Sequence, residues 1–421
     1  MSHIVIDGGT QLKGRVKASG SKNAALPILA ATVLVDDRVI IKNVPDLKDV
    51  HTMLSILQHV GKQVSFSDNT VIVDPGKLLI GSIPYELVGK MRASFNLLGP
   101  LTVACGWAKV GKPGGCNIGQ RPVDYHIDGL KAIGFEIFEE HGDIHSKIMD
   151  SVAKRISYEL PFPSVGTTEQ LMTSAAFIPG MELELENVAR EPEIEDLQNF
   201  LNAMGANITG AGTNRLTVIG SNNKKGVEYE IIPDRIEACT YLLAGIATKG
   251  KVKVEGPFAK YSEAFLKKVK ELGVDAEINE EYVEVSVIYS LKPLKVSAEP
   301  YPGFPTDLQP IITAVLCTAE GDSQVEELVF ENRFGYVDEL NRMGARVKVH
   351  DRTAFISGVK KLSGTRVSAP DIRAAAALLV AALSAEGEST IENASHIFRG
   401  YESLREKYRD LGAKLEIYPD E

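Results

Sequence analysis

A unit of about 70 residues recurs six times along this chain, and this repeat restricts the possible folds more than any other feature. Each copy contains an amphipathic segment that ends at a glycine and is followed by two short alternating strands, as in residues 50–74. The glycines, which we expect to cap helices in a left-handed conformation, are Gly61, Gly134, Gly205, Gly273, Gly344 and Gly412. Their spacings of 73, 71, 68, 71 and 68 residues form a register that chance does not maintain.

A second segment recurs between these copies, with a polar start, a run of small apolar residues, a tight turn and a strand. Residues 22–44 and 371–394 are two of its six copies. A helix that is apolar on all sides must be buried, whereas a helix with one polar face lies at the surface. Each unit is therefore predicted to contain one inner and one outer helix.

The length of the chain sets the number of domains. At 421 residues it is too long for one hydrophobic core, and six units divide into two similar domains of three. We predict an α/β fold in which each domain packs strands and outer helices around parallel inner helices. The N-termini of the inner helices then meet at one end of each domain, where free N–H groups and positive dipole ends favour an anion.

Polar and charged side chains stand at the predicted starts of the inner helices. They are Lys22, Asn23, Arg92, Thr168, Glu169, Asp234, Arg235, Asp307, Asp371 and Arg373. Helix capping is a sufficient explanation for the threonine and the three aspartates. It does not explain the lysine and the arginines, because a cation at a helix N-terminus opposes the dipole. Each of these cations is predicted to face a partner carboxylate or an anionic ligand.

Charge and composition exclude several classes of protein. A net charge of −10 argues against general nucleic-acid binding, which requires a basic surface. No apolar run is long enough to cross a bilayer, and the start MSHIVIDGG lacks the zones of a signal peptide, so we expect a cytoplasmic protein without membrane insertion. The four cysteines are too scattered for a disulfide framework or a zinc site, and we expect a reducing compartment and no metal.

One cysteine stands in a different setting from the others. Cys116 follows Pro-Gly-Gly in a glycine-rich loop, where Lys112 and Arg121 would favour its thiolate. The other three lie in apolar helical runs, as free cysteines usually do: Cys105, Cys239 and Cys317. Spacing alone leaves a nucleophilic role and an incidental role for Cys116 equally open.

Three further places combine a rigid backbone with a reactive group. Two prolines stiffen the approach to Asp307 in YPGFPTD, Arg399 stands beside a glycine in HIFRGYE, and residues 164–166 lead into a helix start in PFPSVGTTE. Each has an ordinary alternative, because Asp307 can cap its helix, Arg399 can be a surface cation and the Ser-Val-Gly turn can be only a loop. Their predicted convergence on one end of the repeats favours a functional site.

The order of several short motifs points to a known family. GSKNAALP, MRAS, PGGCNIGQRPVD, PSVGTTE, AREPEIEDL, PDRIE, FPTD, FENRF, RMGA, DIRA and HIFRGYE follow one another along the chain. With them the chain resembles the enolpyruvyl transferase family from residue 2 to about residue 417, most closely the members that act on UDP-N-acetylglucosamine. The family fold is two inside-out α/β domains of three units each. The resemblance implies a first domain at residues 21–231, which carries the Cys116 loop, and a second at residues 1–20 plus 232–421.

The resemblance also implies a reaction. The enolpyruvyl group of phosphoenolpyruvate would pass to the 3′-hydroxyl of UDP-N-acetylglucosamine with release of phosphate, through a tetrahedral intermediate, in the first committed step of peptidoglycan synthesis. No cofactor is implied. Addition across the enol double bond needs a proton for the methylene carbon, a base near the hydroxyl, and fixed cations for the phosphate and the carboxylate.

Site residues follow from the same resemblance. Cys116 would be the general acid, also able to form a covalent adduct with phosphoenolpyruvate, and Asp307 the base. The groups implied for phosphoenolpyruvate are Lys22, Arg121 and Arg399 on the phosphate, with Asn23, Arg92 and Arg373 beside them. Those implied for the sugar nucleotide are Asn23, Arg92, Arg121, Pro122, Val123, Asp124, Tyr125, Ser164, Val165, Gly166, Asp307 and Val329. Asp371 and Arg333 would support the site, and substrate binding is expected to close the domains and exclude water.

Two other functions remain open from the sequence. The sister transferase of the shikimate pathway shares the fold and phosphoenolpyruvate but acts on shikimate 3-phosphate, and its pattern lacks the PGGC loop. A noncatalytic sugar-nucleotide sensor on the same scaffold would be expected to have lost a reacting group, whereas Lys22, Cys116, Asp307 and Arg399 are all present here. Release of phosphate in the presence of each acceptor distinguishes the three.

Overall fold

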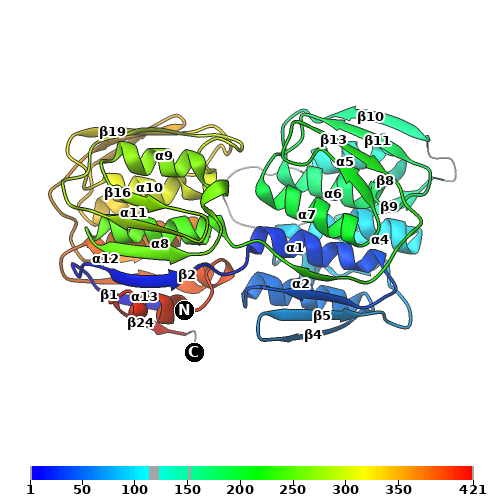
Figure 1. Ribbon diagram of the computed structural model, residues 1–421, viewed down its shortest axis with the longest axis horizontal. Helices are drawn as coiled ribbons and strands as arrows, with labels where there is room; N and C mark the ends of the chain where they lie inside the picture. Colours follow the sequence, from blue (N-terminus) through cyan, green and yellow to red (C-terminus); the bar gives the residue numbers. More distant parts are fainter. Residues whose placement is uncertain (1, 113–122, 150–152, 420–421) are drawn as a thin grey trace. The chain divides into compact units, whose positions relative to one another are not determined.

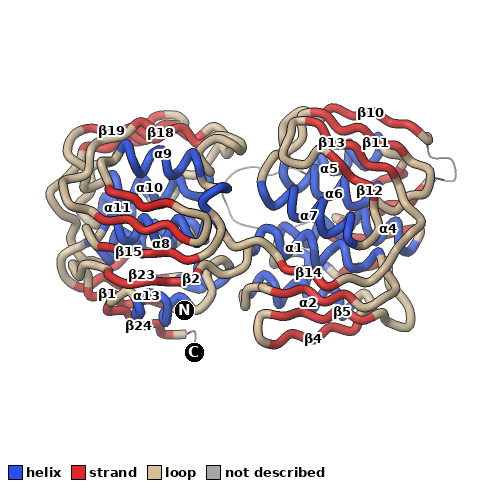
Figure 2. The backbone as a smooth tube through the Cα atoms, in the orientation of Figure 1, coloured by secondary structure: helices blue, strands red, loops and turns tan. Residues whose placement is uncertain are grey.

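The computed structural model describes residues 2–112, 123–149 and 153–419 of the chain. These residues form two compact units, one made of residues 2–19 and 233–419 and the other of residues 20–112, 123–149 and 153–232 (Figure 1). Each unit contains three four-stranded sheets and three inner helices among its described residues. Figure 2 shows the strands toward the outside of each unit, with helices packed behind them.

All six sheets share one strand pattern. The first strand is parallel to the second, and the third strand is antiparallel to both the second and the fourth. In the unit of residues 20–232 the sheets run β14 (Glu228–Glu230), β3 (Val39–Lys42), β5 (Thr70–Asp74), β4 (Gln63–Ser67); then β6 (Ser82–Ile83), β7 (Trp107–Gly111), β9 (Asp143–Ile148), β8 (Phe135–Glu140); then β10 (Arg155–Glu159), β11 (Glu182–Glu186), β13 (Arg215–Ile219), β12 (Asn207–Thr209). The repeat seen in the sequence is therefore a repeat of sheet topology.

The other unit is built in the same way but takes its strands from both ends of the chain. Its sheets run β2 (Lys13–Lys17), β15 (Lys251–Glu255), β17 (Tyr282–Ser286), β16 (Asp275–Ile278); then β18 (Lys295–Ala298), β19 (Asp322–Glu327), β21 (Thr353–Ser357), β20 (Val347–His350); then β22 (Arg366–Ser368), β23 (Glu388–Glu392), β1 (His3–Asp7), β24 (Lys414–Tyr418). Strand β1 supplies the third position of the last repeat, and the His3 ring stacks on Tyr418 with centroids 4.8 Å apart. The N-terminal strand thus completes a repeat that begins near the C-terminus.

Inner and outer helices separate as the two sequence patterns predict. The inner helices are α1 (Lys22–Ala31), α4 (Leu98–Cys105) after the 3-10 turn η2 (Arg92–Leu97), and α6 (Val165–Ala175), then α8 (Arg235–Ala247), α10 (Gln309–Leu316) after η4 (Thr306–Leu308), and α12 (Ile372–Ser384). Every residue of α8 is buried, and the three inner helices of that unit pack on one another. The apolar faces of α8, α10 and α12 and of the sheets behind them make one continuous core.

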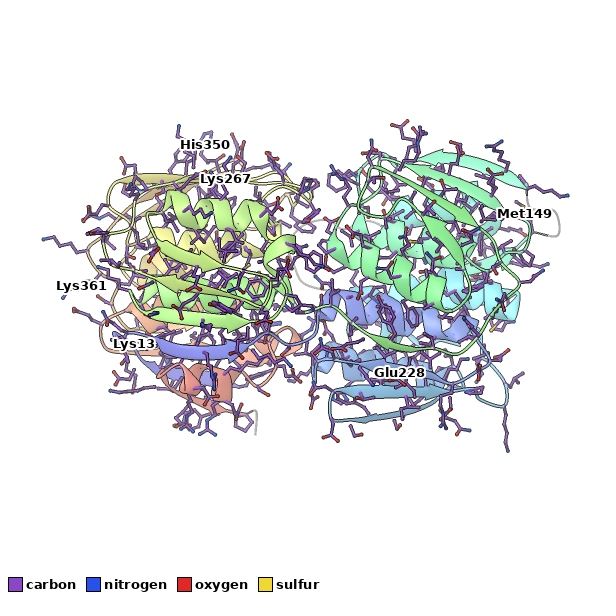
Figure 3. The ribbon with its side chains drawn as sticks, viewed as in Figure 1. Lys13, Met149, Glu228, Lys267, His350 and Lys361 are labelled. Carbon is purple, nitrogen blue, oxygen red and sulfur yellow. The ribbon has the colours of Figure 1, made fainter. Side chains whose placement is uncertain are left out.

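Each outer helix follows, along the chain, the second strand of its sheet. It packs against the next strand in the chain, which is the fourth strand of that sheet. They are α2 (Lys48–His59), α5 (Asp124–Ala132), α7 (Pro192–Ala203), α9 (Glu263–Glu271), α11 (Val337–Arg342) and α13 (Leu404–Asp410). Shorter pieces complete the described chain, namely η1 (Thr32–Leu34), α3 (Tyr85–Val88), η3 (Ala259–Tyr261) and η5 (Ala394–Arg399). Charged side chains cover the outside, and Figure 3 shows Lys267 of α9 and His350 of β20 pointing outward.

The six repeat glycines end the outer helices in the predicted conformation. Their φ angles are 109° (Gly61), 94° (Gly134), 106° (Gly205), 81° (Gly273), 89° (Gly344) and 87° (Gly412). This is the left-handed region, which costs a residue with a Cβ about 1–2 kcal/mol. The prediction of helix-capping glycines is confirmed.

Two of these glycines differ in the atoms that an added Cβ would contact. A Cβ at Gly205 would lie 2.1 Å from the Asn223 carbonyl oxygen, whereas nothing lies within 4 Å of a Cβ at Gly344. We expect Gly344→Ala to lower the free energy of unfolding by about 1 kcal/mol, from backbone strain alone. Gly205→Ala is expected to cost roughly 2 kcal/mol more, because the carbonyl must move. Urea unfolding of the two variants measures the difference, and equal losses would contradict the steric argument.

No helix in the described ranges is long and apolar enough to cross a membrane.

Candidate active site

Asp307 lies between two buried arginines in the unit that contains both chain ends. Its Oδ1 accepts a hydrogen bond from Arg333 Nη2 at 2.6 Å, and its Oδ2 accepts from Arg373 Nη2 at 2.8 Å and Nε at 3.1 Å. The Asp307 side chain is 26% exposed, whereas Arg333 and Arg373 are 4% and 7% exposed. A ligand can therefore reach the carboxylate, while the two guanidinium groups hold it from behind.

Capping does not account for Asp307. Helical turn η4 has no side-chain cap, and the aspartate lies inside the turn with its carboxylate committed to arginines. Asp234 and Asp371 do cap, each accepting two backbone N–H groups at the starts of α8 and α12. Thr168 does not cap α6, because Ser164 takes that position. The explanation by capping is thus correct for Asp234 and Asp371 and wrong for Asp307 and Thr168.

The starts of the three inner helices of this unit meet around Arg373. Its guanidinium binds Asp307 beside α10, donates from Nη1 to the Tyr401 hydroxyl at 3.2 Å, and is attracted by Asp234 at the start of α8. Burial lowers the pKa of Arg373, but the charges of Asp307, Tyr401 and Asp234 and the hydrogen bond to Tyr401 together outweigh burial, so the net shift is upward. The sequence prediction that this cation has a partner carboxylate is confirmed.

Two other predicted residues of this unit occupy nearby segments. Arg399 ends η5, a turn that packs against α12, and its side chain is partly exposed. Val329 follows β19, and its backbone N–H donates to Glu327 Oε1 at 2.9 Å. Both stay predictions as ligand contacts.

In the other unit, Lys22 opens α1 and meets a carboxylate. Ser21 caps this helix, and Lys22 Nζ lies 3.4 Å from Asp49 Oδ2 at the start of α2. Both side chains are nearly buried, with 11% and 6% exposed. The predicted partner carboxylate for this cation is therefore present, and Asn23 follows it with a partly exposed side chain.

Three more helix starts of this unit come together. Arg92 begins η2, whose Asn96 Nδ2 donates to Glu169 Oε2 of α6 at 2.6 Å. His126 of α5 bonds through Nδ1 to Gln170 Oε1 of α6 at 2.5 Å. Predicted sugar-nucleotide residues stand at the first turns of α5 and α6, each partly or fully exposed: Val123, Asp124, Tyr125, Ser164, Val165 and Gly166. The structure thus brings η2, α5 and α6 together at these residues.

Glu169 is the most strongly perturbed acid of this cluster. Burial raises its pKa to about 8 from 4.5, and the hydrogen bond from Asn96 opposes the shift only in part. Between pH 5 and pH 8 the folded chain keeps this proton while the unfolded chain has lost it. Folding stability from this group therefore falls as pH rises through that window.

Glu169→Gln is expected to remove this loss of folding stability at higher pH. The melting temperature of the variant should rise relative to the parent as pH increases from 5 to 8, because glutamine keeps the acceptor for Asn96 and has no proton to lose. Other acids with raised pKa, such as Glu237 at about 7, are present in both proteins and cancel in the difference. Thermal unfolding of both proteins at each pH measures this difference in melting temperature. The control is Glu136→Gln, which changes an exposed glutamate of β8. A difference that does not change with pH would contradict the assignment.

Three predicted residues, Cys116, Arg121 and Pro122, lie outside the described residues. The other cysteines are packed as expected: burial raises the pKa of Cys239 and of Cys317 to about 12, and raises that of the partly buried Cys105. These three thiols are poor nucleophiles at neutral pH. Among the residues that the structure describes, no group of three histidine, cysteine or acidic side chains is arranged to hold a metal ion.

Sequence reasoning missed several residues that hold the predicted ones. Asp49, Asn96, Thr306, Glu327 and Tyr401 all contact a predicted side chain or its immediate neighbour. Tyr401 lies within the motif HIFRGYE and Thr306 within FPTD, where their places near Arg399 and Asp307 were usable signals. The other three lie in segments whose contacts depend on how the repeats pack.

The comparisons with known proteins cover nearly the whole chain. A profile described as EPSP synthase (3-phosphoshikimate 1-carboxyvinyltransferase) matches residues 6–408. The chain is 63% identical over 421 residues to UDP-N-acetylglucosamine 1-carboxyvinyltransferase of Kosmotoga olearia and 50% identical over 424 residues to that of Thermotoga maritima, with all of both chains covered in each case.

Solved structures agree on the fold. The enolpyruvyl transferase NikO from Streptomyces tendae is 25% identical and superposes with a TM-score of 0.89 over 99% of this chain and 98% of that one. EPSP synthase from Acinetobacter baumannii, at 16% identity, has a TM-score of 0.77 over the full length of both chains and supports the fold alone. The inside-out α/β fold predicted from the repeats is confirmed. Its repeats, its helix-start residues and these full-length relatives show that the chain belongs to the enolpyruvyl transferase family and, within it, to the UDP-N-acetylglucosamine 1-carboxyvinyltransferases.

Proposed function

We propose that this protein transfers the enolpyruvyl group of phosphoenolpyruvate to the 3′-hydroxyl of UDP-N-acetylglucosamine and releases phosphate, in the first step of peptidoglycan synthesis. The observation that carries the proposal is the 63% identity over the whole chain to the Kosmotoga olearia enzyme. UDP-N-acetylglucosamine 1-carboxyvinyltransferase 1 of Staphylococcus aureus is 44% identical, again over the full length of both chains. The acceptor in these relatives is the sugar nucleotide rather than shikimate 3-phosphate.

The reaction has two steps with separate demands. In the first, the acceptor oxygen bonds to C2 of phosphoenolpyruvate, its proton goes to a base, and an acid delivers a proton to C3. In the second, the C–O bond to phosphate breaks and C3 returns a proton, which restores the double bond. We assign the acid to Cys116 and the base to Asp307.

Asp307 has the surroundings that this base requires. Two guanidinium groups donate three hydrogen bonds to its carboxylate, one to Oδ1 and two to Oδ2. The partly exposed face is the one a ligand can approach, because the arginines occupy the buried side.

Fixed cations would bind the anionic parts of phosphoenolpyruvate. We assign the phosphate to Lys22, Arg121 and Arg399, and the carboxylate and its surroundings to Arg92 and Arg373, with Asn23 beside Lys22. Asp371 holds the start of α12 and so supports Arg373. Lys22 already pairs with Asp49, and binding of a phosphate there would compete with this pair or share its charge.

The sugar nucleotide would contact the first turns of two helices of one unit. Ser164, Val165 and Gly166 begin α6, and Asp124 and Tyr125 begin α5, where free backbone N–H groups favour phosphate oxygens. We assign residues 121–123 and Val329 to the same substrate. A role for Cys116 as an acid requires a free thiol, so we place the protein in the reducing cytoplasm.

One assay tests the proposal against its alternatives. The purified protein is incubated with phosphoenolpyruvate and either UDP-N-acetylglucosamine or shikimate 3-phosphate, and released phosphate is measured. We expect phosphate only with the sugar nucleotide. Phosphate only with shikimate 3-phosphate would identify the sister reaction, and binding of the sugar nucleotide without phosphate would identify a sensor.

A further inference from the structure

A buried carboxylate behind the candidate base belongs to none of the roles assigned above. Glu327 ends β19 and is fully buried. Its Oε1 accepts the backbone N–H groups of Val329 at 2.9 Å and Phe330 at 3.0 Å, and its Oε2 accepts from Thr306 Oγ1 at 2.8 Å. Three donors converge on this carboxylate, so its position is fixed from two sides.

Thr306 connects that carboxylate to the candidate base. Its Oγ1 also accepts from Arg333 Nη1 at 2.8 Å, and Arg333 Nη2 donates to Asp307 Oδ1 at 2.6 Å. A guanidinium can only donate, so the threonine accepts from Arg333, and its own hydroxyl donates to Glu327. The direction of every bond in the chain from Glu327 through Thr306 and Arg333 to Asp307 is therefore determined.

Burial and an aromatic contact restrict Arg333 in addition to these hydrogen bonds. It is 4% exposed, and its guanidinium carbon lies 5.0 Å from the centre of the Phe330 ring, whose backbone N–H is itself held by Glu327. Burial raises the pKa of Glu327, and its hydrogen bonds and the charge of Arg333 oppose that shift. The carboxylate therefore acts on Arg333 both through Thr306 and by its charge.

We propose that Thr306 and Glu327 are positioning residues for the enolpyruvyl transfer, which hold Arg333 so that its Nη2 fixes the Oδ1 atom of Asp307 toward the acceptor hydroxyl. The proposal rests on the proposed function, since it takes Asp307 as the base. Neither residue touches substrate in this assignment. Their effect is on the orientation of the carboxylate, and a misplacement of a catalytic group by a fraction of an ångström lowers kcat rather than affinity.

The test compares variants that break or keep one hydrogen bond. Thr306→Val removes the hydroxyl with almost no change of shape, Thr306→Ser keeps it, and Glu327→Gln keeps an acceptor for the two backbone N–H groups but offers Thr306 a donor instead of an acceptor. We expect Thr306→Val and Glu327→Gln each to lower kcat roughly tenfold, with the KM for UDP-N-acetylglucosamine changed less than about twofold. Thr306→Ser should recover most of the loss.

The double variant provides the sharpest readout. Because both changes break the same bond, Thr306→Val with Glu327→Gln should lower kcat about tenfold, not about a hundredfold. Ser297→Ala is the matched control: it removes another hydroxyl-to-carboxylate bond, from Ser297 Oγ of β18 to Glu326 Oε2 of β19 at 3.0 Å, without a link to Asp307. It should leave kcat within about twofold, and assays are run below the melting temperature of every variant.

Several results would overturn the proposal. These are a Thr306→Val enzyme with near-normal kcat, a Thr306→Ser enzyme as slow as Thr306→Val, an additive double variant, or a Ser297→Ala enzyme as impaired as Thr306→Val. Failure of the proposed function is a different result, because then the unaltered protein releases no phosphate with UDP-N-acetylglucosamine, or Asp307→Asn turns over normally.

Discussion

Asp307→Asn is expected to lower kcat roughly a thousandfold, the largest loss among the described residues. Asparagine cannot take the proton of the acceptor hydroxyl. It also leaves Arg333 and Arg373, which are 4% and 7% exposed, without the carboxylate that both contact. The variant therefore loses a reacting group and places two buried cations against a neutral amide, which costs stability as well as rate.

The measurement must separate these two losses. Phosphate release gives kcat, and thermal unfolding together with equilibrium binding of UDP-N-acetylglucosamine shows whether the variant is folded and binds. Asp322→Asn is the control, because this exposed aspartate begins β19 and accepts a hydrogen bond from the Ser357 hydroxyl at 2.7 Å, away from Asp307. A folded Asp307→Asn enzyme that binds the sugar nucleotide and keeps near-normal kcat would refute the base assignment.

Cys116→Asp is expected to retain turnover and to lose inactivation by fosfomycin. A carboxylic acid can still deliver a proton to C3 of phosphoenolpyruvate, but it lacks the thiolate that, as the family resemblance implies, opens the epoxide of this antibiotic. Residual phosphate release after preincubation with fosfomycin measures inactivation, and the intact mass of each protein measures covalent attachment of the inhibitor. The unaltered protein should gain one molecule of inhibitor, and the variant none.

The control for this experiment is another cysteine. Cys105 is the most exposed of the three cysteines that the structure describes, and burial raises its pKa. Cys105→Ser should therefore be inactivated by fosfomycin as fast as the parent. Covalent inhibition of Cys116→Asp at the parent rate would show that the loop assignment is wrong.

The six repeats were accessible from the sequence because their signals are local. A glycine that must adopt a positive φ and a helix that is apolar on all sides depend only on a few neighbouring residues. The first strand of each sheet was not predicted, since strands such as β14 (Glu228–Glu230) and β6 (Ser82–Ile83) are too short and polar for an alternating pattern. Their place at a sheet edge depends on a parallel partner that lies elsewhere in the chain.

The candidate site also has features that the local sequence predicts and features that depend on tertiary packing. That cations at helix starts need anionic partners follows from the helix dipole, and Lys22 and Arg373 have such partners. Which carboxylates they meet could not be predicted, because Asp307 and Arg373 are 66 residues apart and approach only when two repeats pack. The same packing decided that Asp307 is held by arginines while Asp371, which looks alike in sequence, caps its helix.

By itself, therefore, the sequence determined the number of units, the ends of their helices, the burial of each helix and, through its motifs, the family and its reaction. Only the tertiary structure decided which strands complete each sheet, that β1 closes the last repeat, and which buried groups hold Asp307 in place. The physical reason is the range of the interactions. Periodicity and backbone conformation depend on neighbouring residues, whereas the hydrogen bonds that link Asp307 through Arg333 and Thr306 to Glu327 exist only after distant segments have met.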